Sequence, residues 1–161
     1  MSYNSKKAIA RTAGNIIILS AYIIYVLGKT VAGSEDLRPW AISILAFTGA
    51  GIALLIIIEI LFHIFSAIGI AVKERSQDEK SIKQTISSSM IEDERDKLIS
   101  LKSSFTAFVC ASAGFIAAMI FLVFANNNAA SLHIMFSGFC GGSIIQGVVS
   151  IYYYEKGVRI G

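Results

Sequence analysis

Glu59 and His63, in the second apolar stretch of the chain, are residue types that can do chemistry inside a membrane. They are four positions apart, so in a helix they share one face. A carboxylate beside an imidazole suggests a proton relay, a cation site, or half of a metal site completed by a second copy. We favour a structural ion pair or an interfacial residue. Counted from Trp40, Glu59 lies about 28 Å along a helix, near the inner bilayer boundary, where water or a basic residue of the central loop can reach it.

Gln146, in the fourth apolar stretch, is the third candidate intramembrane polar residue, and a hydrogen bond to a neighbouring helix is its simplest role. Two ligands on one helix do not define a metal site. The sequence has no H-E-x-x-H, G-x-S-x-G, glycine-rich phosphate loop or C-x-x-C motif. Cys110 and Cys140 are interpreted as small buried hydrophobic residues. We therefore predict a protein that is not an enzyme, with no catalytic residue, metal or cofactor.

The elements that must position these side chains are predicted to be membrane-spanning helices. Of the 161 residues, 55% are hydrophobic and one is proline, which is too apolar for a soluble domain of this length. A membrane span requires about 20 apolar residues. Four stretches come close to or exceed this length: about 12–28, 40–66, 105–125 and 130–154. Helices satisfy their own backbone groups in lipid. The sequence therefore predicts one all-α domain over residues 1–161, an integral membrane bundle of four transmembrane helices.

The basic residues predict the orientation of this bundle. They precede the first span, separate the second from the third, and follow the fourth: Lys6, Lys7, Arg11; Lys73, Arg75, Lys80, Lys83, Arg95, Lys97, Lys102; Lys156, Arg159. Only Lys29 and Arg38 fall in the first short loop. The positive-inside rule then places both termini and the loop at about 73–102 in the cytoplasm, with the chain in a cell (inner) membrane. This distribution accounts for the net charge of +3 without a nucleic-acid partner.

A helix start precedes the third span. Ser89 and Glu92 form a capping box, acidic residues occupy the first turn, and no helix breaker follows before the apolar run from Phe105. We expect the third transmembrane helix to extend into the cytoplasm and to present a juxtamembrane interaction element: Asp93, Glu94, Arg95, Asp96 and Lys97.

Upstream of this element, apolar residues recur every four positions at Ile82, Ile86 and Met90. Such a stripe can lie on the inner leaflet, pack on the end of the second span, or pair with another subunit.

Small residues in the last two spans predict close helix packing. The fourth span contains Gly138 and Gly142 in a G-x-x-x-G pattern, and the third is rich in alanine. We favour packing within one chain, with a subunit interface as the alternative.

The chain resembles a family of small uncharacterised prokaryotic membrane proteins with four spans. The resemblance rests on Asp-Glu-Arg-Asp-Lys-Leu-Ile at 93–99, before the third span, and on Tyr-Tyr-Glu-Lys-Gly at 153–157. It covers mainly the second half of the chain. It implies the four-span architecture and an importance of the central element, and it implies no catalytic residue.

Two functions are compatible with these features. The first is a non-enzymatic scaffold or regulator that acts through homo-oligomerisation or a membrane-protein partner. The alternative is an oligomeric small transporter or channel in which Glu59 is a proton or cation site and lines a path with His63 and Gln146. The alternative predicts that Glu59 faces a cavity, whereas the first predicts an ion pair or exposure to interfacial water.

Overall fold

The computed structural model describes residues 3–29, 37–73, 94–125 and 127–157. Those residues form four long helices: α1 (Tyr3–Gly28), α2 (Leu37–Lys73), α4 (Glu94–Ala125) and α5 (Asn128–Lys156). All four are long and apolar enough to cross a membrane. The predicted all-α class, with four helices long and apolar enough to span a membrane, is thereby confirmed for the described residues.

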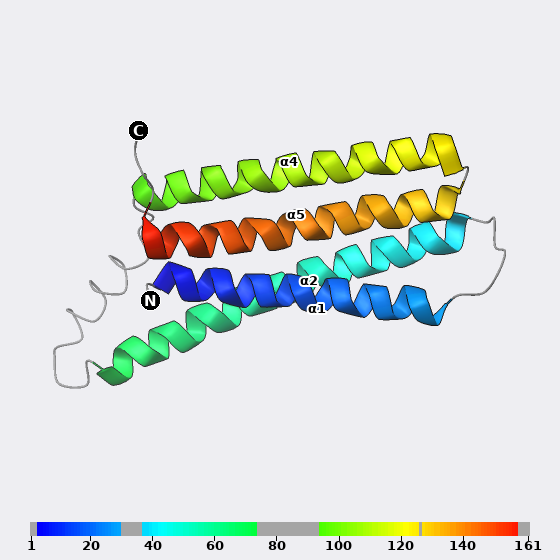
Figure 1. The fold of residues 1–161 in the computed structure, drawn as a ribbon. Helices are drawn as coiled ribbons and strands as arrows, with labels where there is room; N and C mark the ends of the chain where they lie inside the picture. The colour runs from blue at the N-terminus through cyan, green and yellow to red at the C-terminus, as the bar shows by residue number, and fades with distance from the viewer. Residues whose placement is uncertain (1–2, 30–36, 74–93, 126, 158–161) are drawn as a thin grey trace.

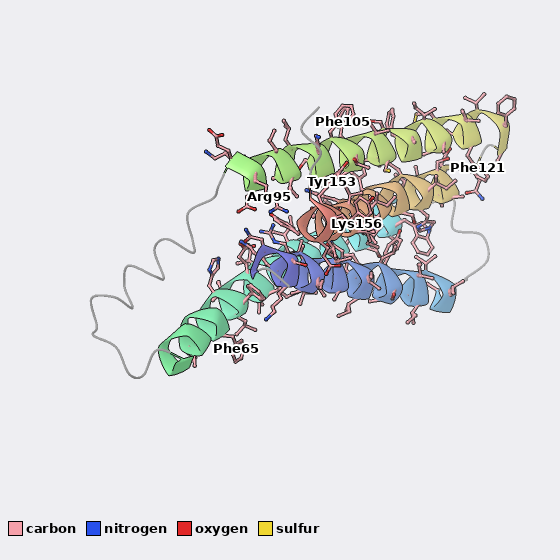
Figure 2. The ribbon with its side chains drawn as sticks, turned by 60° about the vertical axis from the view of Figure 1, so that its left-hand side comes forward. Phe65, Arg95, Phe105, Phe121, Tyr153 and Lys156 are labelled. Carbon is pink, nitrogen blue, oxygen red and sulfur yellow. The ribbon has the colours of Figure 1, made fainter. Side chains whose placement is uncertain are left out.

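The helices run side by side, alternating in direction (Figure 1). The starts of α1 and α4 lie at the same end as the finishes of α2 and α5, and we call this the charged end. The opposite end, where Tyr22, Trp40 and His133 lie, is called the aromatic end. Towards the charged end α2 diverges from the other helices in both views (Figures 1 and 2). This divergence separates the last turns of α2 from α4 and α5.

The packing of α4 on α5 depends on glycine. A Cβ at Gly138 would lie 2.8 Å from the Cα of Gly114, and a Cβ at Gly142 would lie 2.9 Å from the carbonyl oxygen of Ala107. The two backbones therefore approach more closely than any larger residue allows. Gly138 and Gly142 both face α4 of the same chain.

The helix α1 packs against α2 and α5. A Cβ at Gly147 of α5 would collide with the Thr12 side chain of α1, and a Cβ at Gly51 of α2 would lie 3.6 Å from Ile18. Thr12 donates its hydroxyl proton to the carbonyl of Ala8 at 2.7 Å. Its polar group is thereby satisfied within α1, although its Oγ1 is the Thr12 atom that a Cβ at Gly147 would meet first.

Local signals define the ends of α5. The Asn127 side chain accepts a hydrogen bond from the Ala130 amide at 3.0 Å and caps the first turn. Gly157 adopts a φ of 82° and donates its N–H to Tyr153 at 3.0 Å, which stops the helix.

Apolar side chains cover the outside of the bundle. Figure 2 shows Phe65 and Phe105 on its surface, and they are 68% and 67% exposed. An outward apolar surface is what a multi-pass membrane protein presents to lipid.

The helices are longer than the predicted spans. For example, α1 begins at Tyr3, whereas the predicted span begins near residue 12, and α4 begins at Glu94, ahead of the span predicted from Phe105 and within the expected extension of that helix. Hydropathy detects the apolar core of a helix and misses its polar terminal turns. The predicted capping box at Ser89 and Glu92, the residue Asp93, and the stripe of Ile82, Ile86 and Met90 lie outside the described residues.

Candidate functional site

The Glu59 carboxylate is held by two basic side chains of α1. Lys7 contacts its Oε1. Arg11 contacts its Oε2 through one Nη atom and donates from Nε to the same oxygen at 3.0 Å. The His63 Nε2 lies 3.7 Å from Oε1. One carboxylate is therefore surrounded by three basic side chains. We call these four residues the Glu59 cluster: Lys7, Arg11, Glu59 and His63.

Helix geometry explains why these residues meet. Lys7 and Arg11 are four apart on α1, and Glu59 and His63 are four apart on α2, so each pair forms one face. The two helices run antiparallel, which brings the beginning of α1 beside the second half of α2 (Figure 1). Two of the three basic partners of Glu59, Lys7 and Arg11, thus come from the N-terminal helix.

The Glu59 cluster lies in a cavity of about 730 Å³ at the charged end, lined by all four helices. Most of the residues that line it are polar. Its polar lining residues are Asn4, Lys7, Arg11, Thr12, Asn15, Glu59, His63, Asp96, Ser100, Ser103, Ser143, Gln146, Ser150 and Tyr154. The Glu59 side chain is 28% exposed. A water-sized or larger ligand can therefore reach it.

Two further hydrogen bonds join the helices around this cavity. Asn4 donates to Asp96 Oδ2 at 2.7 Å, linking α1 to α4. Gln146 donates to the Ser104 hydroxyl at 3.0 Å, linking α5 to α4. Gln146 lines the same cavity as Glu59 and His63. The three predicted intramembrane polar residues therefore surround one space.

Only part of the predicted juxtamembrane element lines the cavity. Of its described residues, Asp96 lines the cavity, whereas Glu94, Arg95 and Lys97 are exposed on the first turn of α4. Figure 2 shows Arg95 at the same end of the bundle as Tyr153 and Lys156. The element thus borders the cavity with one of its acidic residues.

A second polar cluster lies at the aromatic end. The Tyr22 hydroxyl is 2.6 Å from His133 Nδ1, joining α1 to α5. The Trp40 ring meets the His133 ring edge-on with centroids 4.7 Å apart, and the Tyr22 ring lies 4.3 Å from that of Phe136. Tyr22 is 2% exposed. None of the residues of this aromatic cluster (Tyr22, Trp40, His133 and Phe136) lines the cavity at the charged end.

Next to this cluster, Tyr25 of α1 is hydrogen-bonded to the Ser43 hydroxyl of α2 at 2.9 Å. Ser43 donates its own proton to the carbonyl of Pro39, also at 2.9 Å, so Tyr25 is the donor between the two hydroxyls.

The aromatic cluster was not expected from the sequence. In the sequence, Tyr22 is one of several polar residues of the first apolar stretch, Trp40 is typical of an interfacial aromatic residue, and His133 lies in no motif. Its one sequence signal is a histidine three residues before Phe136, one helical turn away. That signal does not reveal which helix it faces.

Within the described part of the chain, no group of three His, Cys, Asp or Glu side chains comes together to hold a metal ion. Cys110 and Cys140 are both free thiols of intermediate burial.

No protein-family model, curated protein or solved structure matches the chain. The resemblance of the 93–99 and 153–157 segments to small prokaryotic four-span proteins therefore stays a prediction. The candidate site is described by its own geometry alone.

Proposed function

We propose that this protein is a non-enzymatic scaffold or regulator of the cell (inner) membrane, which uses the cavity at its charged end as a cytoplasmic binding site. The carrying observation is that all four helices contribute polar side chains to one cavity at that end. On this proposal both termini and the central loop are cytoplasmic, and the first turns of α4 extend into the cytoplasm.

The charges and the helix lengths support this orientation. The described basic residues of α1, α4 and the end of α5 gather at the charged end. The stretch from Arg11 to Gly28 is about 26 Å long, so a hydrocarbon core of about 30 Å that starts near Gly28 ends near the Glu59 cluster. The cluster then lies at the inner boundary, where lysine and arginine side chains are favoured.

An exposed stripe of small residues on α2 supports homo-oligomerisation. Ala46, Gly49, Ala50 and Ala53 are all exposed, and a Cβ at Gly49 would meet no atom within 4 Å. Small residues spaced by four let a second helix approach closely in lipid. Gly138 and Gly142, by contrast, are already occupied by α4. We therefore propose α2 as the face that meets a second copy or a membrane-protein partner.

The alternative, an oligomeric transporter with Glu59 as a proton or cation site, is favoured by the position of Glu59 in a polar cavity. Two observations weigh against it. Both oxygens of Glu59 already contact basic side chains. The lining residues on α1 run from Asn4 to Asn15, about 17 Å of helix, which is little more than half of a hydrocarbon core.

The test uses the purified full chain in lipid nanodiscs and proteoliposomes. The proposal expects a dimer or larger assembly by single-molecule photobleaching, which Gly49→Leu weakens and Gly141→Leu leaves intact. Gly141 is the matched control because its Cβ would also meet open space, but on α5. In proteoliposomes we expect no proton, Na⁺ or K⁺ flux. A flux that Glu59→Gln abolishes would instead establish the transporter.

A further inference from the structure

The Glu59 cluster has more positive than negative charge. Lys7 and Arg11 are cations at neutral pH, and both contact the single carboxylate of Glu59. The cluster therefore has a net charge of about +1 with His63 neutral, and protonation of His63 adds one more. A membrane protein compensates such a charge with a counter-charge or with water. The local excess favours an incoming anion over an incoming cation.

The basic side chains retain hydrogen-bonding capacity for that anion. Arg11 has five N–H groups, of which two are directed at Glu59 Oε2, and its side chain is 52% exposed. Lys7 has three N–H groups around one Nζ and contacts one oxygen. Paired Arg and Lys donors, with hydroxyls such as Ser100 and Ser150 in the same lining, are the groups that bind phosphate in proteins.

The second carboxylate of the cavity, that of Asp96, has a different partner from the Glu59 carboxylate, which contacts Lys7 and Arg11. Asp96 accepts a hydrogen bond from the neutral Asn4 amide at 2.7 Å. Glu59 is therefore the carboxylate that an incoming anion must partly displace from Lys7 and Arg11. This arrangement gives Glu59 the role of an internal competitor.

We propose that the cavity binds a phosphate group, with Lys7 and Arg11 as its cationic ligands and Glu59 as the internal anion that competes with it. The inference deepens the proposed function and rests on it for the cytoplasmic placement of the site. The cavity of about 730 Å³ has room for a group larger than phosphate alone. At the inner membrane boundary that phosphate comes either from an anionic lipid headgroup or from a water-soluble phosphorylated molecule.

The experiment measures phosphate binding by the full chain in two arms. In the first, native mass spectrometry counts phosphatidic acid retained by protein from nanodiscs of phosphatidylcholine with and without phosphatidic acid. In the second, inorganic phosphate is titrated against protein in pure phosphatidylcholine nanodiscs, with the thermal unfolding midpoint as readout. Each arm compares the wild type with Glu59→Gln, Arg11→Gln and Arg11→Lys, and with Lys6→Gln as the matched control, since Lys6 is an exposed cation of α1 that does not line the cavity.

At an anion site, removal of the Glu59 charge should strengthen phosphate binding. Glu59→Gln should tighten binding by about tenfold, the scale of one neighbouring charge at a partly exposed site. Arg11→Gln should weaken binding by at least as much, Arg11→Lys should restore part of it, and Lys6→Gln should match the wild type. Retention of phosphatidic acid identifies a lipid source. A response to inorganic phosphate without lipid preference identifies a soluble one.

Binding in neither arm, or binding weakened by Glu59→Gln, overturns the phosphate site. Failure of the proposed orientation is read separately, from labelling of Lys6→Cys and Lys29→Cys in a Cys110→Ala, Cys140→Ala background with a membrane-impermeant maleimide in intact cells. Labelling of Lys6→Cys from outside would contradict the cytoplasmic placement without affecting phosphate binding by the purified protein. Circular dichroism of every variant shows whether the helices are retained.

Discussion

The two ends of the bundle join their helices with polar side chains in opposite ways. At the aromatic end, Tyr22 and His133 form a neutral pair enclosed by rings, and Tyr22 is 2% exposed. At the charged end, Glu59 pairs with Lys7 and Arg11 beside a cavity, and these side chains are 24–52% exposed. The hydrogen bond at the aromatic end therefore lies in a closely packed contact between helices, whereas the ion pairs at the charged end leave room for a ligand.

The physical reason lies in desolvation. A neutral tyrosine–histidine pair can be buried among rings at modest cost because its hydrogen bond satisfies both groups. Ionic groups cost far more to bury, so they stay where water reaches them. At the charged end the Glu59 cluster lines a cavity, and its side chains are partly exposed. Stability is therefore expected to depend on the aromatic end, and ligand binding on the charged end.

The largest effect on stability is predicted for Tyr22→Ala. Removing a large buried side chain and its hydrogen bond should lower the free energy of unfolding by about 3–5 kcal/mol. The measurement is the midpoint of SDS-induced unfolding followed by circular dichroism. Ile24→Ala, at a site 70% exposed on the same helix, is the control and should cost much less. Equal losses would contradict the assignment of Tyr22 to the structural core.

A smaller effect is predicted for Glu59→Gln. The substitution leaves Lys7 and Arg11 without their carboxylate. It should lower the free energy of unfolding by about 1–2 kcal/mol, a value between the costs of breaking an exposed and a buried ion pair. Because the cluster is open to solvent, the difference from wild type should shrink as NaCl increases. SDS unfolding at two salt concentrations checks both points. If Glu59→Gln lowered the free energy of unfolding as much as Tyr22→Ala, the proposed difference between the two ends would be wrong.

The smallest effect is predicted for Tyr22→Phe, which keeps the ring and removes only the hydrogen bond to His133. Such bonds between membrane helices contribute about 0.6 kcal/mol on average and at most about 1.7. A double-mutant cycle with His133→Phe isolates the pair. A coupling energy near zero would show that ring packing alone holds the aromatic end together.

Much of the architecture followed from the sequence, but the extent of each helix did not. The apolar core of α2 is unmistakable, whereas its start at Leu37, next to Arg38 and Pro39, falls in mixed sequence that hydropathy does not detect. Likewise, the spacing of Glu59 and His63 predicted a shared face. The partners of that face, Lys7 and Arg11, lie about fifty residues earlier and no local pattern connects them.

That four apolar stretches form helices could be predicted from the sequence alone, because in lipid the backbone must satisfy its own hydrogen bonds. The sequence also determined which residues share a helix face, since that depends only on spacing. Only the tertiary structure decided that Gly138 meets Gly114, that Tyr22 meets His133, and that Glu59 shares a cavity with Gln146. Those contacts depend on which helix packs against which and at what register, and these follow from the fit of side chains over the whole bundle.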